Sequence, residues 1–143
     1  QITIFTLAHS VTLAMASLGL VNISPSLVEP LIAASIVYVA IENFYSKAIN
    51  LRRSLVVFIF GLLHGLGFAS VLAEFGLPVQ QFIPALIGFN IGVELGQLSV
   101  VFILFIGIGY WFNKKNWYRK FITLPISGAV GLIGSYWFFE RII

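Results

Sequence analysis

The chain has 143 residues, of which 59% are hydrophobic and 9% are charged, and its formal net charge is +3. A soluble domain carries about 25% charged residues, so this composition excludes a soluble globular protein. The chain has no Cys, which excludes disulfides and thiolate metal sites. Any metal that it binds must therefore use His, carboxylate, amide or hydroxyl ligands.

Five apolar segments follow one another along the chain, and each meets the requirement of about 20 residues for a helix that crosses a bilayer. The fourth is long enough to tilt or to protrude from the membrane. They are Ile2–Val21, Val28–Ser46, Ser54–Ala73, Phe82–Phe112 and Phe121–Phe139. Their apolar runs are continuous and do not alternate as membrane β-strands do. The sequence therefore predicts an all-α fold: a polytopic transmembrane helix bundle with about five membrane-spanning helices, forming a single domain over residues 1–143.

Basic residues mark one side of this bundle. Seven of the eight Lys and Arg residues lie in the connections Lys47–Arg53 and Asn113–Lys120, which follow the second and fourth segments. Both connections must lie on the same side, and by the positive-inside rule that side is cytoplasmic. We expect an integral protein of a bacterial inner membrane, with the lipid bilayer as its solvent and no nucleic-acid partner.

The fourth segment has two different faces. The polar residues Asn90, Glu94 and Gln97 are spaced i, i+4 and i+7, which places them within roughly 60° on one face of a helix. A tandem GxxxG run, formed by Gly88, Gly92 and Gly96, projects from roughly the opposite side and predicts close packing on a neighbouring helix. A carboxylate at membrane depth is costly and marks a functional candidate. Structural hydrogen bonds between helices would also account for the three polar residues.

The third segment places His64 between glycines, in the stretch Gly61–Gly67. Glycines allow a neighbouring backbone to approach the imidazole closely, and they could also free carbonyl groups as ligands. We expect His64 to face Asn90, Glu94 and Gln97 in a polar layer near mid-membrane. The alternative is a buried structural His bonded to one carbonyl or carboxylate.

A second polar layer is expected nearer the cytoplasm. His9 and Glu42 lie at similar depths, counted from the connections, so they could pair. Such a pair could ligate a metal ion or only stabilise the bundle as a salt bridge. Glu29 lies near the start of the second segment, where the helix dipole favours a carboxylate. The glycines of the last segment, Gly128, Gly131 and Gly134, could pack internally or join copies in a homo-oligomer.

The residue types favour a divalent ion. Imidazole and carboxylate together suit Ni²⁺, Co²⁺, Fe²⁺ or Zn²⁺. A path that conducts an ion needs several sites of moderate affinity, because a single tight site would not release it. The same residues could instead relay protons.

Four stretches resemble signatures of the HupE/UreJ family of membrane proteins. They are residues 5–13 (FTLAHSVTL), 28–43 from Val28-Glu29 to Glu42-Asn43, 60–69 (FGLLHGLGFA) and 89–97 (FNIGVELGQ). They occur in order and cover four of the five segments. The family is also characterised by an upstream helix with a His-x-x-x-Gly-x-Asp-His motif. Residues 1–143 do not contain that motif, and we expect such a helix to precede Gln1.

The resemblance implies a permease for nickel, or for cobalt or iron, of the kind associated with hydrogenase and urease maturation. It points to His9, Glu42, His64, Asn90 and Glu94 as ligands, and Gln97 completes the predicted metal-binding set. On this reading the divalent metal ion is a substrate and the chain is not an enzyme.

Two alternatives stay open. The first is an intramembrane metal-dependent enzyme, although the chain has no HExxH or Gly-x-Ser-x-Gly motif. The second is a haem-binding membrane subunit with His9 and His64 as axial ligands. Their different expected depths argue against it.

Overall fold

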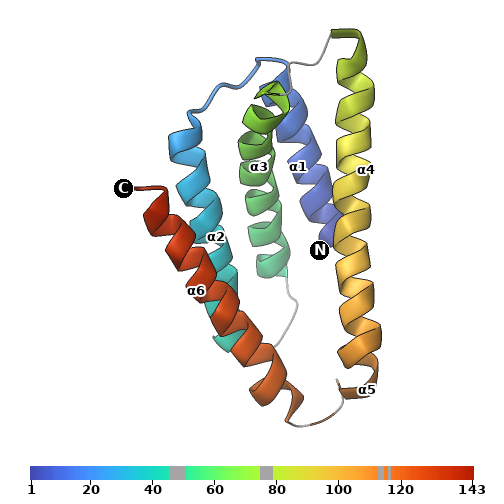
Figure 1. Ribbon diagram of the computed structural model, residues 1–143, viewed down its shortest axis with the longest axis vertical. Helices are drawn as coiled ribbons and strands as arrows, with labels where there is room; N and C mark the ends of the chain where they lie inside the picture. Colours follow the sequence, from blue (N-terminus) through green and yellow to red (C-terminus); the bar gives the residue numbers. More distant parts are fainter. Residues whose placement is uncertain (46–50, 75–78, 113–114, 116) are drawn as a thin grey trace.

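The computed structural model describes residues 1–45, 51–74, 79–112, 115 and 117–143, without the side chains of residues 70–74, 79, 80 and 82. Every regular element in these ranges is a helix, which confirms the predicted all-α fold (Figure 1). The predicted end of the second segment, Ser46, and the connection residues 47–50, 75–78, 113, 114 and 116 lie outside the described ranges. The basic residues Lys47 and Lys114 are among them.

The elements follow the predicted segments with shifted ends. They are α1 (Ile2–Ser17), α2 (Pro25–Tyr45), α3 (Leu51–Glu74), α4 (Val79–Leu104), the π-helical turn η1 (Phe105–Gly109), α5 (Tyr110–Phe112), the π-helical turn η2 (Arg119–Thr123) and α6 (Leu124–Glu140). The segment predicted at 82–112 is thus one helical run, interrupted by a π-turn, and the last segment begins with a second π-turn.

Four described helical runs are long and apolar enough to cross a membrane: Pro25–Tyr45, Leu51–Ala69, Ile83–Phe112 and Arg119–Glu140. The first helix is shorter. Its 16 residues reach about 24 Å, less than the hydrocarbon thickness of about 30 Å. Among the described residues, the structure therefore gives four candidate spans and one short apolar helix, where the sequence predicted five segments long enough to cross.

The predicted end of the first segment at Val21 was too far along the chain. Gly19 takes a left-handed conformation, with φ of 73°. The N–H of Gly19 donates to Ala16 O and that of Leu20 to Met15 O, which together form a Schellman motif. Because glycine adopts this conformation without steric cost, the helix ends here although the residues that follow are apolar.

Neighbouring helices pack in the order α6, α2, α3, α1 and α4 (Figure 1). Consecutive helices in this order run antiparallel except α3 and α1, which run parallel, since Gly61 lies against Phe5 and Gly65 against His9. The pair α2 and α6 lies at one edge and α4 at the other. The carboxyl end of α2 and the amino ends of α3 and η2 therefore lie at one end of the molecule. We call this the basic end, because Arg52, Arg53 and Arg119 lie there. The start of α2 and the end of α6 lie at the opposite end.

The contact between α1 and α3 depends on the predicted glycines. A Cβ added to Gly61 would lie 2.7 Å from Phe5 O and 2.9 Å from Ala8 Cβ. A Cβ added to Gly65 would collide with His9 O and Thr12 Oγ1. The close approach of a neighbouring backbone to the His64 segment is thus confirmed. Thr12 Oγ1 closes the contact by donating to Leu62 O at 2.7 Å.

The glycines of α6 also pack inside the chain. A Cβ on Gly131 would lie 3.1 Å from Ala40 Cβ, and one on Gly134 would lie 3.0 Å from Ile36 Cγ2 of α2. Of the two roles that the sequence left open for this face, the structure shows internal packing against α2.

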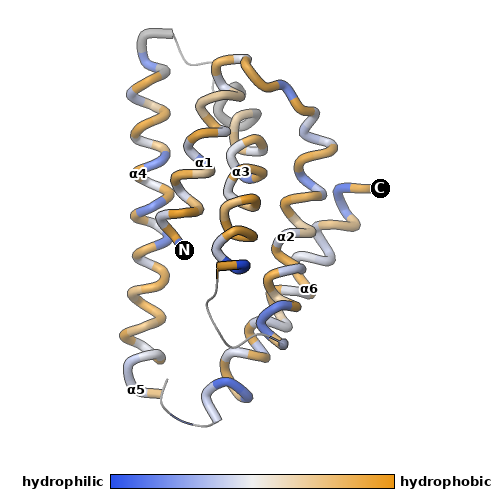
Figure 2. Tube along the Cα trace, turned by 180° about the vertical axis from the view of Figure 1, so that it is seen from behind, coloured by the Kyte–Doolittle hydropathy of each residue, from blue (hydrophilic) through white to orange (hydrophobic). Residues whose placement is uncertain are grey.

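The GxxxG face of α4 behaves differently. No atom of the described structure lies within 4 Å of a Cβ added at Gly88, Gly92 or Gly96. The prediction that this face packs closely on a neighbouring helix is wrong for the described part of the chain. Small residues permit close packing but do not enforce it. α4 is mostly hydrophobic along its length (Figure 2) and contacts α1 through a different face.

Candidate functional site

His9 lies at the centre of an aromatic cage between α1, α3 and α4. Its exposed fraction is 0%. The ring centroids of Phe5, Phe68 and Phe89 lie 6.0, 5.4 and 6.2 Å from that of His9. Neither ring nitrogen has a hydrogen-bond partner among the described residues. The cage therefore holds an imidazole whose polar atoms are not satisfied by the described protein groups.

His64 lies beside this cage on α3. Its Nδ1 is 2.8 Å from Phe60 O, one turn earlier in the helix. Because a carbonyl can only accept, Nδ1 donates, and in the neutral ring the lone pair is on Nε2. The His64 ring packs edge-on against Phe5 with centroids 5.1 Å apart. Both histidines of the chain thus meet the same phenylalanine.

Helical spacing explains how the cage forms. Phe5 and His9 are four residues apart on α1, and His64 and Phe68 are four apart on α3, so each pair lies on one helix face. The glycine contact between α1 and α3 brings these two faces together. Sequence reasoning singled out the histidines and missed the phenylalanines, although the i, i+4 spacing was a usable signal.

Asn90 joins α4 to α1. The Ser10 hydroxyl donates to Asn90 Oδ1 at 2.7 Å, and Asn90 Nδ2 donates to Leu86 O at 2.8 Å. Both ends of the amide are therefore occupied, and Asn90 bonds to α1 and not to His64 as the predicted layer required.

Glu94 and Gln97 are half-buried on the same helix. Gln97 lines an open cleft of about 600 Å³ between α1, α3 and α4, together with Gln1 and Phe5. Its Oε1 is buried and has no partner among the described groups. Glu94 has no ion-pair partner within the described ranges. Gln97 thus offers an amide oxygen at the cleft, and Glu94 offers a carboxylate three residues earlier on α4.

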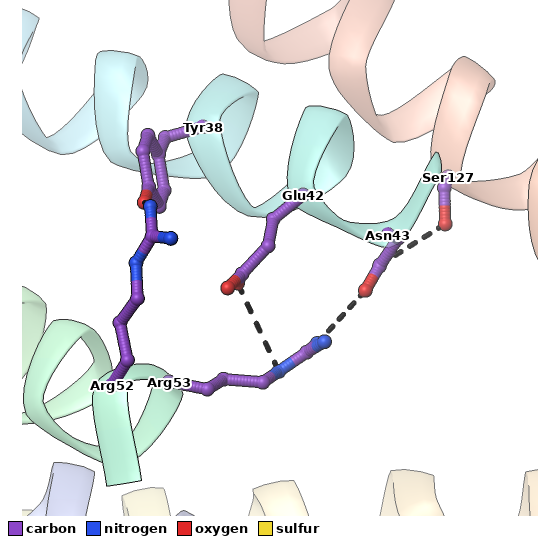
Figure 3. Close-up of polar contacts among 6 residues, drawn as sticks. All are labelled: Tyr38, Glu42, Asn43, Arg52, Arg53 and Ser127. Carbon is purple, nitrogen blue, oxygen red and sulfur yellow. Dashed lines mark hydrogen bonds and ion pairs between the residues drawn. The ribbon is translucent and has the colours of Figure 1, made fainter. Parts of the chain in front are cut away.

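Glu42 belongs to a separate network at the basic end, drawn in Figure 3. Its Oε2 lies 4.0 Å from Arg53 Nε. Arg53 also donates to Asn43 Oδ1 at 2.8 Å, and Asn43 Nδ2 donates to Ser127 Oγ at 3.1 Å. The predicted pairing of Glu42 with His9 is wrong. The similar depths were counted along the chain, but the two side chains face different neighbours.

Arg119 completes the basic end. Its guanidinium donates to Asn43 O at 2.8 Å and Phe44 O at 3.0 Å. These carbonyls belong to the last described turn of α2, and carbonyls at a helix end are the ones that need donors from outside the helix. Arg53 and Arg119 each belong to one of the predicted basic connections, and both bind Asn43. This agrees with the prediction that the two connections lie on the same side.

The predicted metal ligands do not form one preassembled site. Among the described residues, no three His or acidic side chains lie close enough to hold a metal ion together. His9 and His64 share the aromatic cage, Glu94 and Gln97 lie on α4, Asn90 bonds to α1, and Glu42 lies at the basic end. A bound ion would have one or two protein ligands at each position and would complete its coordination with water.

A family model described as HupE / UreJ protein matches residues 1–141 of the chain. Neither a curated protein nor a solved structure matches the chain. The family match covers the histidine cage, α4 and the basic end together.

Proposed function

The chain belongs to the HupE/UreJ family of membrane proteins, and from this premise we propose that it is a permease for a divalent transition-metal ion. Nickel is the first candidate, followed by cobalt and iron. The metal ion is the substrate, and the proposal assigns no catalytic step to the chain. It places the protein in a bacterial inner membrane with the basic end in the cytoplasm.

The observation that carries the proposal is the state of His9. A buried polar group without a partner costs about 1–3 kcal/mol, and a phenylalanine would fill an aromatic cage without that cost. His9 is fully buried and both of its nitrogens lack a partner among the described groups. A side chain in this state is better explained by a ligand that it binds than by packing.

The neighbouring groups suit a moving ion. Imidazole nitrogens bind Ni²⁺, Co²⁺ and Fe²⁺ well, and His64 offers Nε2 because its Nδ1 is held by Phe60 O. Gln97 supplies an oxygen ligand at the open cleft, and Glu94 supplies a carboxylate on the same helix. Few protein ligands at each position give moderate affinity, which supports release and onward movement.

Uptake of ⁶³Ni²⁺ into liposomes that contain the purified protein tests the proposal. We expect His9→Phe and His64→Phe to abolish uptake, because each keeps an aromatic ring and removes the nitrogens. The matched control is Ser99→Ala. Ser99 is exposed on α4 and its hydroxyl donates only to Leu95 O of its own helix, so this variant should transport normally.

Two results would contradict the proposal. One is normal uptake by folded His9→Phe and His64→Phe protein. The other is a Soret absorption band in the parent protein that is absent from both variants, which would favour the haem-binding alternative.

A further inference from the structure

A second cavity lies between α2, α3 and the end of α6, and Phe68 of the aromatic cage is part of its wall. It has a volume of about 310 Å³ and is partly open to the surroundings. His64 is on its wall, together with Glu29 and Arg141. His64 therefore borders both the cage, through Phe5, and this cavity. The volume corresponds to roughly ten water molecules at about 30 Å³ each, enough for a hydrated ion.

An ion pair stands at the end of the cavity opposite the basic end. Arg141 Nε lies 3.1 Å from Glu29 Oε2, and the two side chains are 37% and 45% exposed. Arg141 also packs over the ring of Trp137, which lines the same cavity, at 6.0 Å from its centroid. Glu29 is thus not simply a carboxylate at a helix start, as the sequence suggested. It is neutralised by a cation from the far end of the chain.

The charges around this cavity allow a cation from solution to exchange with Arg141 at Glu29. Arg141 is a cation tethered to the protein, and because the pair is partly exposed a cation from solution can compete for the carboxylate. His64 is a neutral nitrogen ligand farther inside, in the middle of α3. A cation that enters would meet an oxygen ligand first and a nitrogen ligand second.

We propose that this cavity is the outer compartment for the transported divalent cation, which displaces Arg141 from Glu29 and then passes to His64. The proposal rests on the proposed permease function. It adds the side from which the cation enters, its first protein ligand, Glu29, and a competitor for that ligand, Arg141. By competing for Glu29, Arg141 lowers the affinity of the cavity for the divalent cation. Arg141 pairs with Glu29 again once the cation has moved to His64, and this favours movement of the cation inward.

Equilibrium binding of Ni²⁺ to the detergent-purified protein tests the exchange. Arg141→Gln leaves Glu29 without its competitor, so Ni²⁺ should bind several-fold more tightly and uptake at saturating Ni²⁺ should be slower. Glu29→Gln should weaken Ni²⁺ binding several-fold. In the double variant, Arg141→Gln should bring no gain, because its effect acts through Glu29.

The matched control is Arg52→Gln, which removes one positive charge at the basic end. Arg52 has a long contact of 3.4 Å to Tyr38 OH and does not line the cavity. Ni²⁺ binding should not change in this variant. An equal gain in Ni²⁺ affinity for Arg52→Gln and Arg141→Gln would show that the gain comes from the change in net charge alone. That result would overturn the proposed outer compartment.

The outcomes separate the two proposals. If Glu29→Gln and Arg141→Gln bind and transport Ni²⁺ like the parent while His9→Phe and His64→Phe abolish uptake, the outer compartment is wrong and the permease stands. If the two variants only lower the unfolding temperature, with unchanged binding by the folded protein, the ion pair is structural and the compartment is again wrong. If all four single variants transport normally, the permease proposal itself fails.

Discussion

At the scale of single residues, His9 differs from the other buried polar side chains. Among the described residues, Thr6, Ser35 and Ser127 are also buried, but each has a partner: Thr6 donates to Ile2 O, Ser35 donates to Ile32 O, and Ser127 accepts from Asn43. The hydroxyls of Thr6 and Ser35 donate to carbonyls of their own helices, whereas the ring nitrogens of His9 have no hydrogen-bond partner among the described groups. His64 does have such a partner, Phe60 O, through Nδ1.

The free energy of unfolding should respond to this difference. We expect His9→Phe to raise it by about 1 kcal/mol, because an apolar ring of similar size replaces an unpartnered polar one. His9→Ala should lower it by about 2 kcal/mol or more, because it opens a cavity in the cage. Thermal unfolding in detergent measures both. A less stable His9→Phe protein would show that the nitrogens have structural partners.

Glycine placement decides packing at the scale of helices. The chain has one GxxxG pair in α3, Gly61 and Gly65, and a tandem run in α4, and the sequence gives no reason to separate them. In the structure α1 lies directly on the α3 pair, while the α4 run meets no described atom within 4 Å. On the α1 side, the Phe5 backbone lies against Gly61 and Thr12 lies against Gly65 and donates to Leu62 O.

Gly65→Ala and Gly92→Ala form a matched pair of variants that compares a packed glycine of α3 with an unpacked glycine of α4. The first places a Cβ against His9 O and Leu13 N, so we expect it to lower the free energy of unfolding by about 3 kcal/mol. The second meets open space and should raise it by up to about 1 kcal/mol through helix propensity.

Analytical size-exclusion and thermal unfolding of both variants provide the readout. A loss of self-association in Gly92→Ala would show that the α4 glycines pack against a second copy of the chain.

Helix ends are joined by charge as well as by packing. Arg119, in η2, donates to two carbonyls at the end of α2, more than 70 residues earlier in the chain. We expect Arg119→Gln to lower the free energy of unfolding by about 1–2 kcal/mol, because the amide cannot supply both charged donors. The conservative Arg119→Lys should recover only part of this loss, since an ammonium lacks the planar fork. Equal stability of all three proteins would contradict the capping role.

Sidedness is a property of the whole molecule. The two ends carry different charge networks: three arginines around Asn43 and Tyr38 at one end, and the Glu29–Arg141 pair at the other. Because the chain has no Cys, single substitutions can report the orientation directly. We expect Lys115→Cys to react with a membrane-impermeant maleimide only in inverted membrane vesicles. Ser24→Cys should react only in right-side-out vesicles. The reverse pattern would overturn the assignment of the basic end to the cytoplasm.

Composition and periodicity were sufficient for the class of fold. Continuous apolar runs predict helices because a backbone in lipid must satisfy its own hydrogen bonds, and this holds wherever the helices pack. Ionisable side chains are costly at membrane depth, and this cost singles out His9, Glu42, His64 and Glu94 from the sequence alone. Helix ends were less predictable, since one left-handed glycine at position 19 stopped α1 within an apolar stretch.

Which polar residues meet was decided only by the tertiary structure. Depth along a helix can be counted from the sequence, but the rotation of each helix about its axis cannot, and a rotation changes every partner. Glu42 therefore pairs with Arg53 and not with His9, and Asn90 bonds to Ser10 and not to His64. The Glu29–Arg141 pair joins residues more than 100 positions apart, and it follows from the packing of α2 against α6. The sequence alone determined what must be buried in the membrane, and the packing of the helices determined what each buried group meets.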